Sequence, residues 1–298
     1  MAIANNLQSL QSLKSFHTNN LSGRVALVTG GGTGVGLTIA RGFVANGAKV
    51  YITGRREDVL KQAAEQTVGL IPLKMDIRDK ESIAHAAGIL EREEGKLDVL
   101  VNNAGIVTPV SPFLSDKSTP KNSRLGLSLF QSESSEDWQN AFATNTIAPF
   151  FTTTGFSDLL EKGARMRGDH ATSSVINISS AAGSFHSSLN AIAYGTTKAG
   201  LDHLTGTLAR EFAIHKVPVR VNGIAPGPFP SEITGIPEEI DRQIKEGTFF
   251  CGTVLPPIER SGREEEITSA VVWLASDGGA FTNGVTLRID GGLALVTP

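Results

Sequence analysis

Short apolar runs alternate with longer amphipathic stretches along most of this chain. The apolar runs have the length and the Val/Ile/Leu content of buried strands and lie at residues 25–28, 49–53, 70–75, 97–101, 175–178, 219–224 and 285–289. Helical spacing follows most of them, at residues 37–46, 57–66, 80–94, 138–160, 194–212 and 264–276. Strands that alternate with helices are typical of a parallel sheet covered on both faces. The pattern predicts an α/β fold: a single-domain, doubly wound parallel sheet (Rossmann fold).

Three segments depart from this alternation. Residues 1–20 are rich in Asn, Gln and Ser, with apolar residues recurring every three positions, which indicates either a short docking helix or a frayed tail. Residues 108–136 contain three prolines and many serines, and residues 228–258 are poorly periodic. We therefore expect an N-terminal extension (1–20) and one Rossmann-fold domain (21–298), with 108–136 as an inserted loop and 228–258 as a lid over a binding site.

Composition excludes several classes of function. The chain has 298 residues, of which 40% are hydrophobic, and a net charge of -3, so a nucleic-acid partner is not expected. No apolar run is long enough to span a membrane, and the first 20 residues lack the apolar centre of a secretory signal. The single cysteine, Cys251, excludes an intramolecular disulfide, and no metal-ligand spacing is found. A cytoplasmic protein without a bound metal is the expectation.

A glycine-rich stretch follows the first predicted strand. Residues 29–36 read Thr-Gly-Gly-Gly-Thr-Gly-Val-Gly and lead directly into a predicted helix. Glycine at positions 30, 34 and 36 would let the backbone turn sharply and approach a ligand without a Cβ clash. Because the N-H groups at a helix N-terminus bind anions, strand, turn and helix together predict a dinucleotide pyrophosphate site.

The end of the second predicted strand bears on cofactor choice. In dinucleotide folds an acidic residue near this point binds the ribose 2′-hydroxyl of NAD, whereas arginine accommodates the 2′-phosphate of NADP. Here the strand ends in Gly54, Arg55 and Arg56, with no acid. The sequence predicts NADP, with Arg55 as the first candidate for the phosphate contact and Arg56 as the second. Asp76, after the third strand, could reach the adenine amino group.

Tyr194 and Lys198 are candidates for acid–base chemistry. Positions i and i+4 lie on one helical face, so the Lys198 ammonium could favour the ionised Tyr194 and lower the pKa of the phenol. A hydroxyl from the end of the preceding strand, Ser179 or Ser180, could hydrogen-bond the same substrate oxygen. Asn145, in mid-helix, could hold a water, bend the helix near the site, or lie on the surface.

These motifs, in this order and at these intervals, resemble the short-chain dehydrogenase/reductase family over roughly residues 22–295. Within the family the chain is similar to rhamnolipid-type β-ketoacyl reductases and their fungal relatives. The resemblance implies that Tyr194 donates the proton, Lys198 lowers its pKa and binds the nicotinamide ribose, Ser180 anchors the substrate oxygen, and Asn145 holds a relay water. The cofactor-binding residues that it implies are Gly30, Gly32, Thr33, Gly34, Val35, Gly36, Arg55, Arg56, Asp76, Ile77, Asn103, Ala104, Gly105, Tyr194, Lys198, Pro226, Gly227 and Phe229.

The function expected from the sequence is reduction of a small-molecule ketone, of β-ketoacyl or secondary-metabolite type, with NADPH. Alcohol or polyol oxidation, or reduction of C=N or C=C, would use the same residues. A non-catalytic NADP-binding protein is the alternative from another class. The resemblance also implies a homodimer or homotetramer built on the helices that start near Trp138 and Tyr194.

Overall fold

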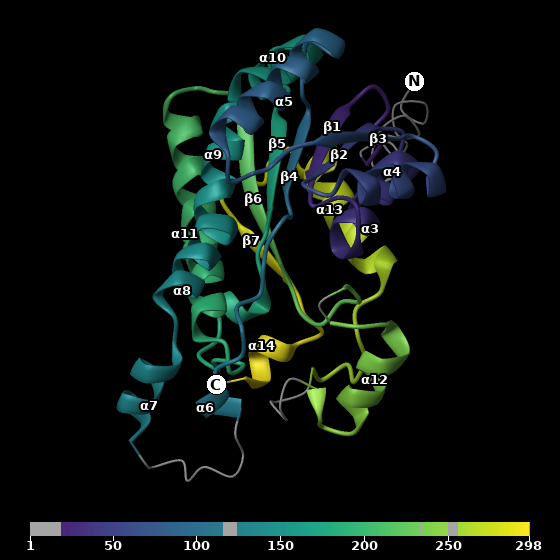
Figure 1. Cartoon of the computed structure of the whole chain (residues 1–298). Helices are drawn as coiled ribbons and strands as arrows, with labels where there is room; N and C mark the ends of the chain where they lie inside the picture. The colour runs from purple at the N-terminus through teal and green to yellow at the C-terminus, as the bar shows by residue number, and fades with distance from the viewer. Residues whose placement is uncertain (1–18, 116–123, 233, 250–255, 298) are drawn as a thin grey trace, which may run out of the picture.

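Seven parallel strands form one sheet within the residues that the computed structural model describes, which are 19–115, 124–232, 234–249 and 256–297. The sheet confirms the doubly wound, single-domain α/β fold. Its strand order is β3-β2-β1-β4-β5-β6-β7, so the switch point where ligands bind in such sheets lies between β1 and β4 (Figure 1). The strands are β1 (Val25–Thr29), β2 (Lys49–Gly54), β3 (Leu70–Lys74), β4 (Val99–Asn102), β5 (Ser173–Ile178), β6 (Val219–Pro226) and β7 (Thr286–Ile289).

Helices cover both faces of the sheet. Ala26 and Val28 of β1 pack with the helices of one face, and Val25 and Leu27 with those of the other. Because successive side chains of a strand point to opposite faces, alternate residues of one apolar run pack into the hydrophobic cores on the two faces of the sheet. The first face carries α3 (Gly34–Ala45), α4 (Glu57–Gln66) and α13 (Glu264–Ala275), and the second α5 (Lys80–Glu93), α9 (Ala148–Gly155), α10 (Ser157–Arg167) and α11 (Ile192–Ile214).

Several shorter helices gather where the strands end. Figure 1 shows α6, α12 and α14 at this end of the molecule, after β4, β6 and β7 respectively. The short elements are α6 (Pro112–Ser115), α7 (Leu125–Ser132), α8 (Ser135–Phe142), the π-helical turn η1 (Ala143–Ile147), the 3-10 turns η2 (Ala181–Gly183) and η4 (Asp277–Gly279), α12 (Pro237–Lys245) and α14 (Leu293–Val296).

The segments without clear periodicity contain more helix than the sequence predicted. Residues 108–136, expected to be irregular, include α6, α7 and the start of α8, while residues 116–123 lie outside the described part. The expected lid, 228–258, includes α12, whose Ile240 and Ile244 are buried against Phe249. Helices of 4 to 9 residues are too short to give a strong periodic pattern, which is why they were missed.

The first described residues, from Asn19 onward, pack against the domain. Leu21 is fully buried, and its N-H donates to the Asn46 carbonyl oxygen at 2.9 Å. Asn19 accepts a hydrogen bond from the Ser276 hydroxyl at 3.1 Å. Residues 1–18, and with them the helical stripe expected there, lie outside the described residues. In the part of the chain that is described, no helix has both the length and the apolar character needed to cross a membrane.

Candidate active site

The turn between β1 and α3 requires glycine at three positions. Gly30 and Gly34 have φ values of 62° and 52°, in the left-handed region that side chains rarely adopt. A Cβ on Gly36 would lie 2.3 Å from the Gly30 carbonyl oxygen. The same three glycines line a cavity at the carboxyl ends of the strands. Backbone N-H groups at the start of α3 are thus accessible to an anion in this cavity.

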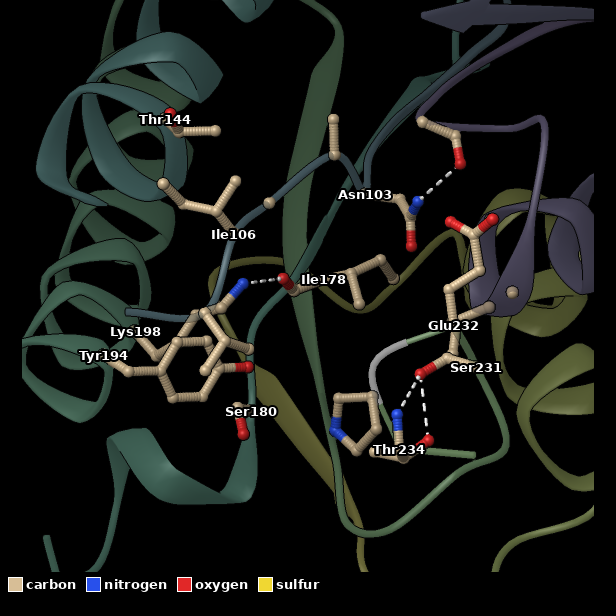
Figure 2. Close-up of a pocket in the computed structure, with 18 of the residues that line it drawn as sticks. Asn103, Ile106, Thr144, Ile178, Ser180, Tyr194, Lys198, Ser231, Glu232 and Thr234 are labelled. Atoms are coloured by element: carbon tan, nitrogen blue, oxygen red, sulfur yellow. Dashed lines mark hydrogen bonds between the residues drawn. The ribbon is translucent and has the colours of Figure 1, made fainter. Parts of the chain in front are cut away.

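Asn103 connects the end of β4 to this turn. Its side-chain Nδ2 donates to the carbonyl oxygens of Thr29 at 3.0 Å and Gly30 at 3.1 Å, and its backbone N-H donates to the Thr29 hydroxyl at 3.0 Å (Figure 2). Ala104 and Gly105 follow it along the wall of the cavity. The Asn103 side chain therefore fixes the glycine turn across the switch point between β1 and β4.

Both candidate arginines reach the cavity, but their surroundings differ. Arg56 donates to the carboxylate of Glu232 at 3.1 Å, whereas Arg55 makes no hydrogen bond or ion pair with any residue of the described part. Asp76 and Ile77 line the cavity after β3, and the contact of Asp76 with the adenine amino group stays a prediction.

A threonine that the sequence did not single out fits the same end of the cavity. The hydroxyl of Thr53, at the end of β2, is buried and lacks a hydrogen-bond partner among the described residues. Thr53 also lines the cavity beside Arg55. The hydroxyl oxygen itself is shielded from the cavity, so other atoms of Thr53 form the wall there. The glycine turn and the two arginines together fit an adenosine carrying phosphate.

The candidate catalytic side chains converge at the other end of the cavity. Tyr194 and Lys198 lie one turn apart near the start of α11, and Ser180 follows the end of β5. Figure 2 shows the hydroxyls of Tyr194 and Ser180 on the same side of the cavity, with Lys198 directed to the Ile178 carbonyl oxygen. The Lys198 Nζ donates to that oxygen at 2.9 Å and lies 5.8 Å from the centre of the Tyr194 ring.

The two serines after β5 have different environments. Ser179 is buried, and its hydroxyl donates to the Lys198 backbone carbonyl at 3.3 Å. Ser180 is half-buried, accepts from the Ala182 N-H at 3.2 Å, and lies close enough to the Tyr194 phenol to lower its pKa. Ser180 is thus the serine beside the phenol, while Ser179 supports the start of α11.

The expected lowering of the Tyr194 pKa is not found. Burial raises the pKa of Tyr194 above its usual value, and the hydrogen bond with Ser180 opposes this only in part. Burial also lowers the pKa of Lys198 to about 8. The expectation was wrong for this ligand-free chain because the helical spacing took no account of desolvation, which disfavours the charged form of both groups. The phenol is therefore protonated at neutral pH.

Asn145 lies in the π-helical turn η1 and joins three segments. Its Oδ1 accepts from the Ile106 N-H at 2.8 Å, and its Nδ2 donates to the Ile106 carbonyl at 2.9 Å and to the Thr197 hydroxyl at 3.0 Å. The expected single helix over 138–160 was wrong, because η1 interrupts it and α9 ends at Gly155, before α10 begins. Of the alternatives for Asn145, a place on the surface was wrong, because the side chain is buried. Its role in holding a relay water stays a prediction.

Asp202 belongs to the same cluster and was missed by sequence reasoning. It lies one turn beyond Lys198 on α11 and raises the pKa of that lysine electrostatically. Its carboxylate accepts a hydrogen bond from the Thr286 hydroxyl at 3.2 Å. The i, i+4, i+8 spacing of Tyr194, Lys198 and Asp202 on one helical face is a signal that could have found it.

The whole cavity has a volume of about 840 Å³. Pro226 and Gly227 form its wall at the end of β6, where a Cβ on Gly227 would lie 2.8 Å from the Asp290 Cα, and Phe229 follows them. The described residues that line it from η2 onward, apart from Lys198 and Glu232, carry no charge. They are mainly apolar and include Ala181, Ala182, Phe185, Leu189, Ala191, Phe249, Pro256 and Leu293. Within the described ranges, no three His, Cys, Asp or Glu side chains are grouped so as to hold a metal ion.

Comparison with known proteins adds to this geometry. Residues 24–240 match the family model described as short chain dehydrogenase. The chain is 35% identical to the short-chain dehydrogenase/reductase VdtF of Byssochlamys spectabilis, over 92% of this chain and 93% of that protein. It is 31% identical to the 3-oxoacyl-[acyl-carrier-protein] reductase FabG of Aquifex aeolicus, over 92% and 98%. The solved Pseudomonas aeruginosa RhlG/NADP active-site complex has a TM-score of 0.76 and 29% identity, and the match covers 93% of this chain and 99% of that one.

Proposed function

This chain belongs to the short-chain dehydrogenase/reductase family, and we propose that it reduces a ketone carbonyl to a secondary alcohol with NADPH. The observation that carries the proposal is the convergence of Tyr194, Ser180 and Lys198 on one cavity that the glycine turn also lines. The arginines at the end of β2 and the similarity to a structure described as an NADP complex support NADP over NAD.

Each residue of this site has a separate role in the proposed ketone reduction. NADPH supplies a hydride to the carbonyl carbon when it is bound. The hydroxyls of Ser180 and Tyr194 hydrogen-bond the carbonyl oxygen and orient it, and Tyr194 donates its proton to the oxygen as negative charge develops there. The raised pKa of Tyr194 keeps the phenol protonated until that moment. A protonated Lys198, 5.8 Å from the ring centre, stabilises the phenolate that forms.

The lining of the cavity favours an uncharged and largely apolar ketone. The walls next to Tyr194 include Ala182 of η2, Phe185 just after η2, and Leu293 of α14. A polyol would leave its hydroxyls without partners against these side chains, at a cost of about 1–3 kcal/mol each. We therefore propose a ketone of β-ketoacyl or secondary-metabolite type, bound in the small-molecule site without a metal.

The test is replacement of Tyr194 by Phe. Tyr194→Phe removes the proton donor and nothing else from the cavity, so we expect kcat for ketone reduction to fall by about 10²–10⁴-fold. The dissociation constant of NADPH, measured by fluorescence titration, should stay within about twofold, since the phenol is not part of the adenosine site. Ser184→Ala, an exposed serine close to Ser180 in the chain, is the control that should leave kcat unchanged.

A substrate panel tests the choice of ketone. Cyclic aromatic ketones and acetoacetyl thioesters should be reduced with a higher kcat/KM than keto-sugar acids. Turnover retained in Tyr194→Phe would overturn the catalytic assignment. A preference for keto-sugar acids would overturn the substrate class and leave the catalytic assignment intact.

A further inference from the structure

A carboxylate from the far part of the chain lies at the adenosine end of the cavity. One oxygen of Glu232 accepts hydrogen bonds from the Thr33 hydroxyl at 3.0 Å and from the Arg56 guanidinium at 3.1 Å. Thr33 precedes α3 and Arg56 precedes α4, so the two donors come from the ends of two neighbouring βα connections. Glu232 is 176 residues from Arg56 in the chain.

Among the described residues, the Thr33 hydroxyl and the Arg56 guanidinium donate a side-chain hydrogen bond to Glu232 alone. Thr33 is the N-cap residue of α3, but its hydroxyl makes no cap hydrogen bond to the helix. A capping threonine normally accepts from a helix N-H, whereas this one donates outward to Glu232. Arg56 likewise extends from the N-cap of α4 toward the same oxygen. Two donors that converge on one anionic oxygen form the kind of arrangement that binds a phosphate oxygen.

Local hydrogen bonds hold Glu232 at this point. Ser231 and Gly235 pair through two backbone hydrogen bonds, of 2.9 and 3.3 Å. Thr234 donates through its hydroxyl to the Phe229 carbonyl and through its N-H to the Ser231 hydroxyl at 3.1 Å. A Cβ on Gly34 would lie 3.1 Å from the Ser231 Cβ, so this turn packs directly against the glycine-rich turn (Figure 2).

We propose that Glu232 is a specificity-determining residue, which competes with the 2′-phosphate of NADP for Thr33 and Arg56. The inference rests on the proposed binding of NADP. A phosphate carries up to two negative charges, and one pair of donors cannot serve it and a carboxylate together. Glu232 must withdraw when the phosphate arrives, and this lowers the affinity for NADPH. With NAD there is no phosphate, and a carboxylate at this place suits a ribose hydroxyl. Glu232 thus takes the place of the acidic residue that is missing from the end of β2. It reduces the ratio of the affinity for NADPH to the affinity for NADH.

The experiment compares NADPH and NADH binding in wild type and Glu232→Gln by fluorescence titration. Glutamine keeps the size of the side chain and removes the charge. We expect the dissociation constant of NADPH to fall by about two- to tenfold, as an exposed ion pair and a charge repulsion are removed. The dissociation constant of NADH should stay constant or rise. Glu238→Gln, an exposed glutamate of α12 outside the cavity lining, removes the same charge and should change neither constant.

A second probe isolates the phosphate. Adenosine 2′-monophosphate should bind Glu232→Gln more tightly than wild type, whereas adenosine 5′-monophosphate should bind both equally. Weaker binding of both dinucleotides to Glu232→Gln would show that Glu232 holds the turn over the cofactor, and would overturn the competition. An unchanged ratio of the two affinities would also overturn it. Failure of the proposed function is distinct, since wild type would then reduce no ketone of the substrate panel, whatever the dissociation constants of the two dinucleotides.

Discussion

Arg56 must break an ion pair before it can contact a phosphate, whereas Arg55 has no ion pair to break in the described part of the chain. Arg56 has a partner in Glu232, while Arg55 has none among the described residues. We expect Arg55→Ala to raise the dissociation constant of NADPH by about tenfold, because a charge-assisted contact is lost with no compensating release. Arg56→Ala should raise it less, because this change also frees Glu232 from its ion pair. Titrations of both variants with NADPH and NADH check the order. A larger effect in Arg56→Ala would reverse the ranking of the two arginines.

Asp202 controls the charge of Lys198. Burial lowers the pKa of Lys198 to about 8, and the Asp202 carboxylate opposes this by raising it. If protonated Lys198 stabilises the forming phenolate, kcat/KM for ketone reduction falls as the pH rises through about 8. Asp202→Asn removes the raising influence, so Lys198 loses its proton at lower pH and the alkaline limb moves to lower pH. A pH–rate profile measures the shift, and Asp202→Glu should restore the limb. If the alkaline limb of the Asp202→Asn profile stays at the wild-type pH, Asp202 does not set the charge of Lys198.

Chain separation explains why the sequence revealed some contacts of the site and not others. Tyr194 and Lys198 could be paired because i, i+4 spacing places them on one helical face. Glu232 reaches Arg56 across 176 residues, and no local pattern encodes that approach. The raised pKa of Tyr194 was missed for a similar reason, since desolvation depends on what the whole fold packs around the phenol.

At the scale of elements, long and regular segments were predictable and short ones were not. The helix expected at 57–66 is α4 with the same bounds, and the helix expected at 80–94 is α5, where Asp79 accepts from the Glu81 N-H at 2.9 Å. The stretch 138–160 has the composition of a helix throughout, yet it is divided by η1. A π-helical turn changes hydrogen-bond partners without changing residue preferences, so the sequence pattern does not reveal it.

Asn145 ties the π-helical turn η1 to the segment after β4. This side chain is 1% exposed and satisfies both the N-H and the carbonyl of Ile106. We expect Asn145→Ala to lower the free energy of unfolding by about 1–3 kcal/mol, because partly buried backbone groups lose their partners. Asn140→Ala, five residues earlier with one side-chain contact to Arg78, should cost less. Urea unfolding of the two variants provides the comparison, and an equal loss in both would exclude a special role for Asn145 in η1.

At the scale of the molecule, the topology followed from simple rules. Alternating strands and helices predict a parallel sheet, and both faces then need apolar cover, which the runs at residues 25–28 and 219–224 provide. The cavity forms where the strand order reverses, so its place was predictable from the fold class. Its lining was not, since the walls that would contact a substrate come from short helices and turns after β4, β6 and β7.

The surface of α9 and η1 leads to the last prediction, which concerns assembly. Ile147 and Phe150 are 49% and 38% exposed on the helical stretch where a homodimer or homotetramer interface is expected. Large apolar side chains grouped on a surface usually mark an interface, and closed symmetric assemblies are the common result.

Light scattering should give wild type the mass of two or four chains. The double variant Ile147→Glu, Phe150→Glu should have a lower mass, because two buried charges at the contact are costly. Val68→Glu, an apolar residue 92% exposed between α4 and β3, is the matched control and should keep the wild-type mass. A wild-type monomer would refute the assembly, and a double variant of unchanged mass would move the interface elsewhere.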